Sequence, residues 1–180
     1  MKNAMTLAAV VIGALVSGSA AAATGTINFI GSVTDSTCSF TPSQNGALGN
    51  TVHLGDYAVV DVANHATVVD FNLVGKNADG SACTATGTGN GDIDVTWLPT
   101  SGHWGVQGLF NEGTATGVEV KLMDKDSKVF TATRDTVNYK AADVTNAVVP
   151  FKAQLVQTSA ATAATAGTVT ASASFSVAYK

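Results

Sequence analysis

The sequence contains little charge and no cluster of one sign. Only 12 % of its 180 residues are charged, and nine Lys and Arg against 13 Asp and Glu give a formal net charge of −4. Phosphate groups are bound by clustered Lys and Arg, so this composition argues against a nucleic-acid partner. No run of about five or six like charges occurs, which argues against a polyelectrolyte tail.

Motifs for catalysis and cofactor binding are also lacking. There is no G-x-S-x-G nucleophile motif, and the glycine-rich residues 86–92 are followed by neither GK[ST] nor a helix pattern. His53, His65 and His103 are scattered without metal-ligand spacing. Residues 124–127 have acidic spacing similar to that of a calcium loop, but the loop's Gly and distal Glu are missing. We therefore expect no enzymatic activity, no metal and no cofactor.

The apolar run near the N-terminus is shorter than the roughly 20 residues needed to span a bilayer. It covers residues 4–16, follows the basic Lys2 and precedes small residues in which Ala21 and Ala23 satisfy the A-x-A cleavage preference. This pattern predicts that residues 1–23 are a cleaved signal peptide. The mature chain would have 180 − 23 = 157 residues and a formal charge of −5, because Lys2 is lost, and it is long enough for one sizeable core.

Cysteine is rare, and both cysteines, Cys38 and Cys83, remain after cleavage. In an exported protein a single pair predicts one intramolecular disulfide. Closing a loop of about 46 residues stabilises a fold by roughly 4 kcal/mol in the chain-entropy model. A metal site built on two Cys would need further ligands at C-x-x-C or H-x-x-x-H spacing, and these are absent.

After Cys38 the chain consists of short apolar segments separated by Gly, Asn, Asp and Ser clusters, which predicts an all-β fold. Alternation predicts strands over residues 68–75, 93–98, 117–123, 148–157 and 168–180, and a further short strand at 129–131. In the third of these, Val118, Val120 and Leu122 are expected to face inward and Glu119 and Lys121 outward. Residues 159–167 (SAATAATAG) are interpreted as a long hairpin tip, not a helix.

The two ends of the mature chain alternate most strictly. Residues 24–35 (TGTINFIGSVTD) place Ile27, Phe29, Gly31 and Val33 on one side of an extended strand. The chain also closes on a regular strand with almost nothing after it. Its alternating small and apolar residues are Val169, Ala171, Ala173, Phe175, Val177 and Tyr179.

Four stretches together resemble pilin subunits of the bacterial chaperone-usher pathway. They are GTINFIGSVTDSTC at residues 25–38, residues 71–83, GTATGVEVKLMDKDSK at residues 113–128, and the C-terminal run with an F-x-A at residues 151–153. Gly167 is fourteenth from the end and Tyr179 is penultimate, as in the family. Residues 76–82 make the approach to the second Cys longer than usual. The resemblance covers the mature chain from end to end in the family's order.

The resemblance implies an all-β, incomplete immunoglobulin-like sandwich that lacks its last strand. Residues 37–180 would form the pilin domain, and residues 24–36 the N-terminal extension that donates a strand to the next subunit. The acceptor groove, which a periplasmic chaperone fills first, would be lined by the C-terminal strand from Gly167 to Tyr179. Implied partners are identical or related pilins, the chaperone, an outer-membrane usher and a host receptor. The expected location is a fimbria on the cell surface, reached through the periplasm.

Several alternatives remain open within this resemblance. The chain is expected to be a structural fimbrial subunit that supports cell adhesion, but a minor tip or adaptor subunit, or a single-domain polyadhesin binding host glycans, is also compatible with the sequence. A terminating subunit would not need a donor segment. Trp97 and Trp104 bracket a turn where aromatic rings can stack on sugars. Packing in the core or against another subunit is the favoured interpretation of these rings.

Overall fold

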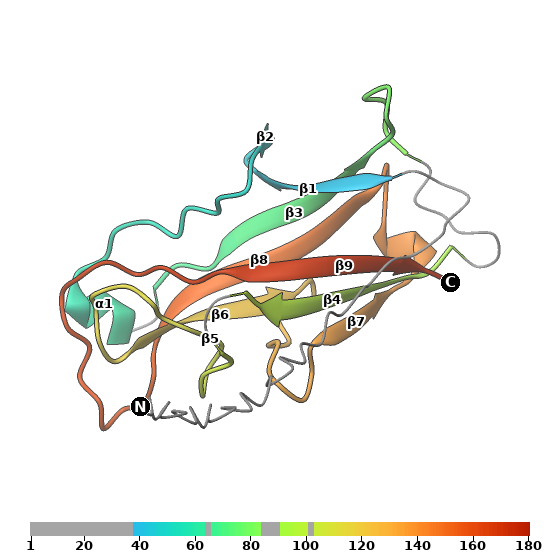
Figure 1. Cartoon of the computed structure of the whole chain (residues 1–180). Coiled ribbons are helices and arrows are strands. Elements are labelled where there is room, and N and C mark those ends of the chain that lie inside the picture. Colours follow the sequence, from blue (N-terminus) through green and yellow to red (C-terminus); the bar gives the residue numbers. More distant parts are fainter. Residues whose placement is uncertain (1–37, 64–65, 84–90, 101–102) are drawn as a thin grey trace, which may run out of the picture. The chain divides into compact units, whose positions relative to one another are not determined.

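Antiparallel β-strands account for nearly all regular structure in the computed structural model, which describes residues 38–63, 66–83, 91–100 and 103–180 (Figure 1). All of these belong to one compact unit, residues 32–180. The elements are β1 (Ser39–Gln44), β2 (Ala47–Leu48), α1 (Val59–Ala63), β3 (Val69–Lys76), β4 (Ile93–Pro99), β5 (Leu109–Phe110), β6 (Val118–Asp124), β7 (Thr136–Tyr139), the 3₁₀ turn η1 (Ala141–Asp143), β8 (Val148–Gln157) and β9 (Ala173–Tyr179).

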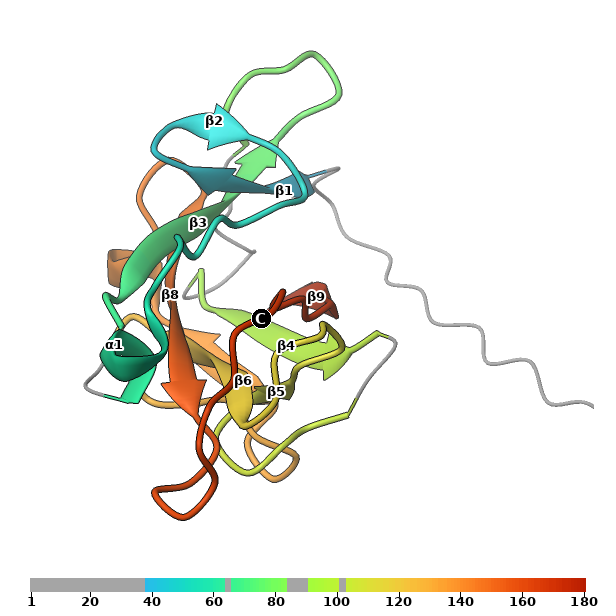
Figure 2. The same cartoon turned by 90° about the vertical axis from the view of Figure 1, so that its left-hand side faces the viewer.

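The strands form two sheets. One has the order β2-β1-β3-β8-β6-β5, and the other has the order β7-β4-β9. In Figure 2, β1 and β3 lie in one layer, and β4 and β9 in the other. The sequence β1-β3-β8-β6 corresponds to the A-B-E-D sheet of an immunoglobulin fold, and β4-β9 corresponds to strands C and F. Among the described residues no strand pairs with the outer edge of β9, which is the place of the seventh strand, so the sandwich is incomplete there, as expected.

Alternating burial along the strands explains how the two sheets pack. In β3, Phe71 and Leu73 are buried, and they pair with Phe151 and Val149 of β8. In β4, Ile93, Val95 and Trp97 are buried in the same way. Because every second residue of a strand points to one face, these side chains meet between the sheets in one core.

Four of the five strands predicted from alternation agree with the structure to within a residue at each end, but the one predicted over residues 168–180 is a strand only over Ala173–Tyr179. The elements β1, β2, β5, β7 and α1 were missed. The prediction for residues 148–157 has the bounds of β8. Residues 159–167 form turns without a helix, as predicted, but they connect β8 to a strand of the other sheet, so the hairpin predicted there is wrong. Residues 129–131 make only isolated bridges, so the strand predicted there is wrong. The helix α1 has five residues, too few to produce an apolar period along the sequence.

The prediction that Glu119 faces outward on a solvent-exposed side of β6 is wrong as regards its exposure. Glu119 does alternate with the inward-facing Val118 and Val120, but it is only 3 % exposed. A loop over residues 105–108 covers this face of β6, and the Glu119 carboxylate accepts hydrogen bonds from the backbone N–H groups of three of its residues. These are Val106 at 3.1 Å, Gln107 at 2.6 Å and Gly108 at 3.1 Å.

The turn after β6 is closed by a buried carboxylate. Asp124 accepts hydrogen bonds from the backbone N–H groups of Asp126 (2.8 Å) and Lys128 (2.9 Å), and it pairs with the guanidinium of Arg134 at 2.5 Å. This agrees with a hairpin turn at residues 124–128. Across the described residues, no three His, Cys, Asp or Glu side chains are grouped closely enough to hold a metal ion.

Within the same part of the chain, none of the helices has the length and apolar character that crossing a membrane requires.

Candidate strand-accepting edge at β9

The last strand, β9, is hydrogen-bonded on one side only. It pairs antiparallel with β4 over its whole length, from Pro99↔Ala173 to Ile93↔Tyr179. It is the end strand of its sheet, and no described strand pairs with its other edge. The backbone N–H and C=O groups on that edge therefore have no strand to bond, which is the usual property of a surface that accepts another strand.

The inward residues of β9 are half-buried, whereas those of its neighbour are fully buried. Val95 and Ile93 of β4 have no exposed surface, yet the residues that pair with them, Val177 and Tyr179, stay partly exposed. The same half-buried state extends along the predicted groove-lining residues Val169, Ala171, Ala173, Phe175, Val177 and Tyr179. Their apolar surface packs against the core on one side and lacks cover on the other.

A second set of half-buried apolar residues comes from the other sheet and the chain that follows it. Phe40 of β1 and three residues of the segment before α1, Val52, Leu54 and Tyr57, also pack against the core without being fully buried. β1 and β9 thus carry the incompletely covered margins of one core, in the two layers of Figure 2. In a complete immunoglobulin sandwich the seventh strand lies beside strand F, which is β9 here.

The segment leading into β9 is fixed to residues 111–116. Glu112 donates its backbone N–H to the carbonyl of Thr170 (2.8 Å), and Ala115 donates to the carbonyl of Thr168 (3.0 Å). The buried Asn111 side chain accepts hydrogen bonds from the N–H groups of Gly113 and Thr170, both at 2.9 Å. The chain is therefore fixed by hydrogen bonds for several residues before β9 begins.

Gly167 lies within this held segment, two residues after Thr165, whose backbone N–H donates to the carbonyl of Thr116 at 3.0 Å. A Cβ atom added there would overlap the backbone of Thr114 and Ala115, so only glycine fits the close approach of the two chains. The glycine expected from the family resemblance thus has a local steric reason. Gly167 itself lies outside β9 and is exposed.

The C-terminal end of β9 is held to β4 by one ion pair, and a second ion pair holds the start of β4 to the chain after β7. Lys180 pairs with Asp94 at 2.6 Å, and its backbone N–H donates to the carbonyl of Asp92 (3.0 Å); Lys140 pairs with Asp92 at 2.6 Å. Burial acts to raise the pKa of Asp94, but hydrogen bonds from Lys180 and Asn138 outweigh it and lower that pKa. The hydrogen bond from Lys140 likewise lowers the pKa of Asp92.

Aromatic rings connect β9 to the core. Trp97 of β4 lies 5.2 Å from Phe175 and 5.3 Å from Phe151, measured between ring centroids. Trp97 is thus a core residue, in agreement with the favoured interpretation, and Trp104 is half-buried against the same core. The hydroxyl of Tyr179 is buried without a hydrogen-bond partner among the described residues, and burial raises its pKa.

Cys38 and Cys83 form a disulfide with a Cα–Cα distance of 5.8 Å. The bond joins the residue before β1 to the chain beyond β3, so it links two adjacent strands of the first sheet. A Cβ at Gly75 would come within 2.7 Å of the Cys83 sulfur, which shows how tightly the bond is packed. The predicted donor residues Ile27, Phe29, Gly31 and Val33, and His65, lie outside the described residues.

Sequence reasoning located β9 but missed the polar residues that hold it. Asn111, Asp92 and Asp94 belong to no motif, and their partners are distant in sequence. One indirect signal was available for Asp94, since it alternates with the buried apolar residues of β4 and so had to lie on the outer face of that strand.

These features define an immunoglobulin-like sandwich without its last strand, whose edge at β9 is open. Residues 27–180 match the family model described as "Fimbrial protein". The chain is 31 % identical over 147 residues to the F107 fimbrial protein of Escherichia coli, covering 78 % of this chain and 81 % of that protein. It is 45 % identical over 78 residues to the K99 fimbrial protein of Escherichia coli, a match that spans 42 % of this chain and 40 % of that protein.

The chain belongs to the fimbrial protein family. Among solved structures it is similar to PapA, the rod subunit of the P pilus, with a TM-score of 0.57, 21 % identity, and coverage of 87 % of this chain and all of that one. That likeness concerns the fold. Membership of the family identifies the chain as a structural fimbrial subunit and not an enzyme.

Proposed function

We propose that this protein polymerises into an extracellular fimbria by donor-strand exchange. The observation that carries the proposal is the open edge of β9, bordered by half-buried apolar residues at the place of the missing seventh strand. A strand added there would receive main-chain hydrogen bonds from β9 and cover the apolar surface of both margins. The half-buried residues on the two sheets would then become part of a closed core.

The donor in this proposal is residues 24–35 of a neighbouring subunit. Ile27, Phe29 and Val33 would face the core of the acceptor, and each buried side chain of this kind stabilises by roughly 1.5 to 3 kcal/mol. Their sum, about 5 to 9 kcal/mol, is an upper estimate because unfolded chains already bury part of such surface. Gly31 would pass the point where the two backbones approach most closely, since it adds no side chain there.

An open edge with an apolar margin is an aggregation hazard before assembly. We infer that a periplasmic chaperone covers β9 first, contacting Phe175, Val177 and Tyr179, and that an outer-membrane usher receives the complex. The extension of the next subunit then replaces the chaperone. The resulting fibre would extend from the cell surface and support adhesion of the cell.

Electron microscopy of cells that express this subunit with its chaperone and usher tests the proposal. Long filaments of this subunit alone are the expected result and would indicate a shaft subunit. Short or absent filaments that lengthen when a second pilin is supplied would indicate a minor subunit. Deleting residues 24–35 should abolish filaments but leave a soluble complex with the chaperone. Filaments made by the deletion variant would disprove the donor role.

A further inference from the structure

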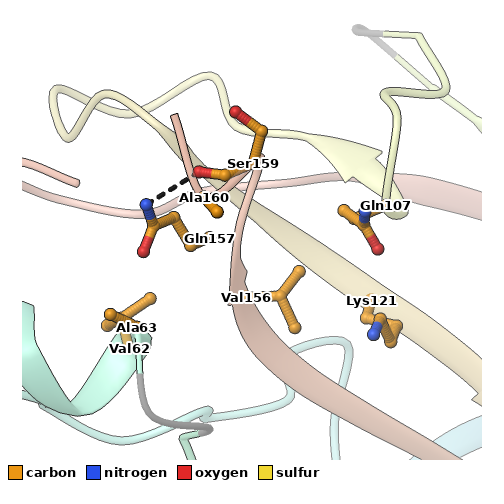
Figure 3. Close-up of a pocket in the computed structure, with 8 residues that line it drawn as sticks. All are labelled: Val62, Ala63, Gln107, Lys121, Val156, Gln157, Ser159 and Ala160. Atoms are coloured by element: carbon orange, nitrogen blue, oxygen red, sulfur yellow. Dashed lines mark hydrogen bonds between the residues drawn. The ribbon is translucent and has the colours of Figure 1, made fainter. Parts of the chain in front are cut away.

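The short helix α1 leaves two apolar side chains exposed. Val59 is 37 % exposed and Val60 is 65 % exposed, although Val62 in the same helix is buried. Val62 and Ala63 point towards Val156 of β8 across a small pocket, so this side of the helix faces the sandwich (Figure 3). Single exposed apolar residues are common on protein surfaces, so the meaning of Val59 and Val60 depends on where α1 lies.

Packing places α1 at one end of the open edge of β9. Val62 forms a small cluster with the buried Ala115 and Val118, and the half-buried Tyr57 and Val169 pack against this cluster. Tyr57 belongs to the incompletely covered margin that follows β1, and Val169 belongs to the chain that leads into β9. Figure 1 shows α1 at the end of the sandwich where the chain enters β9, opposite the end marked C.

A strand that completes the sandwich has a defined direction. Strands of the immunoglobulin fold pair antiparallel, so the seventh strand runs antiparallel to strand F, which is β9 here. A donor segment therefore enters beside Tyr179 and leaves beside Val169. The edge from Val169 to Tyr179 has eleven residues and the donor segment 24–35 has twelve, so Asp35 leaves the edge next to α1. This step rests on the proposed donor-strand exchange.

The domain of the donating subunit begins almost at once after its donor segment. The chain from Asp35 to Cys38 reaches at most about 11 Å when fully extended. Cys38 is bonded to Cys83 and is followed directly by β1, which begins at Ser39. Because the disulfide holds Cys38 in its domain, this connection cannot lengthen by releasing the start of β1. The end of the donor's domain around Cys38 must therefore lie against the end of the acceptor that carries α1.

We propose that Val59 and Val60 of α1 contact the domain of the donating subunit, a second copy of this chain, around its Cys38. The contact is separate from the strand added at β9, and it covers apolar surface that the strand does not reach. Attachment at both β9 and α1 fixes the angle between successive subunits, whereas attachment at β9 alone lets them pivot about residues 36–37. The helix therefore contributes to the stiffness of the fibre.

Hydrogen exchange at α1 tests the contact in two complexes of one acceptor, the isotope-labelled subunit without residues 24–35. In the first complex a synthetic peptide of residues 24–35 occupies the edge of β9. In the second, the extension of an intact, chaperone-capped subunit occupies it, so only this complex brings a domain. The N–H groups of Asp61 and Val62, which donate to the Ala58 carbonyl at 2.9 and 3.3 Å, should exchange at least about tenfold more slowly in the second complex.

The two complexes separate this contact from the proposed function. A peptide that does not bind the acceptor would disprove strand exchange itself, and with it the contact at α1. Equal exchange at α1 in two complexes that both form would overturn the contact and leave strand exchange intact.

A pair of matched variants tests the effect on the fibre. Val60→Asp should still form fibres, because the donor strand is unchanged, but their persistence length in electron micrographs should fall at least about twofold, since a carboxylate opposes burial in the contact. Leu48→Asp is the control: Leu48 is 55 % exposed and pairs with Ser43, which pairs with Asn72 near the middle of β3, away from α1. Wild-type stiffness in Val60→Asp, or an equal loss of stiffness in Leu48→Asp, would contradict the contact.

Discussion

The ring of Phe175 lies 5.2 Å from the ring of Trp97, with the two planes inclined by 53°. Trp97 is buried at the centre of the sandwich, whereas Phe175 on the edge strand is half-buried. The contact therefore joins the core to the margin where the sandwich is incomplete. A strand added at β9 would cover the exposed part of Phe175 and complete the environment of both rings.

Phe175→Ala should destabilise the subunit and impair its assembly. Removal of a fully buried Phe costs about 3 to 5 kcal/mol, and a half-buried ring should cost about 2 kcal/mol. Denaturant unfolding followed by the fluorescence of Trp97 and Trp104 measures the change. Ser176→Ala, on the exposed side of the same strand, should change stability by less than about 0.5 kcal/mol. Equal effects of the two variants would contradict the assigned orientation of β9.

Gly31→Leu should abolish fibre formation while the subunit still folds and binds its chaperone. The proposed reason is that a side chain at this position would meet the acceptor's backbone where the two strands approach closely. Electron microscopy gives the fibre readout, and co-purification with the chaperone gives the folding control. Ser32→Leu adds the same side chain on the opposite side of the segment and should still form fibres. Normal fibres from Gly31→Leu would rule out the donor assignment.

Glu119→Ala should lower the free energy of unfolding by about 3 kcal/mol, because three backbone N–H groups of residues 106–108 lose their acceptor. Glu119→Gln keeps one acceptor oxygen and should cost about half as much. Hydrogen exchange at the buried Gly108 N–H should accelerate in both variants, most in Glu119→Ala. Lys121→Gln, two residues along the same face, is the control and should leave this exchange unchanged. Slow exchange in Glu119→Ala would show that the carboxylate does not hold the loop.

The ion pair between Asp94 and Lys180 should make stability depend on pH in the acidic range. Because the folded state lowers the pKa of Asp94, its stabilisation is complete above the unfolded pKa of about 4. This stabilisation is lost as the pH falls below that value and through the lower pKa that Asp94 has in the folded protein. The difference in unfolding free energy between wild type and Asp94→Asn should therefore be largest near neutral pH and shrink below about pH 4.

Asp70→Asn separates this effect from the general removal of one acidic charge, since Asp70 is exposed and has no ion pair among the described residues. A difference for Asp94→Asn that stays constant from neutral pH to below pH 4 would exclude the coupling.

Prediction from the sequence was most accurate where a strand has one buried face. β8 and β6 were located to within a residue, because alternation directly reports a strand with two different faces. The same reasoning failed for Glu119, since the outer face of β6 is covered by a loop from elsewhere in the chain. The short β5 and β7 and the five-residue α1 were missed because so few residues produce no recognisable period.

The sequence by itself determined the all-β class, the disulfide-forming pair Cys38 and Cys83, and the regular last strand, because these depend on residue type and local alternation. It also supplied the resemblance on which the fimbrial family prediction was based. Only the tertiary structure decided that β9 is an end strand with a half-buried face, and that Asn111 and Asp94 hold it in place. Exposure of an edge depends on which strands pair, and pairing joins residues far apart in the chain.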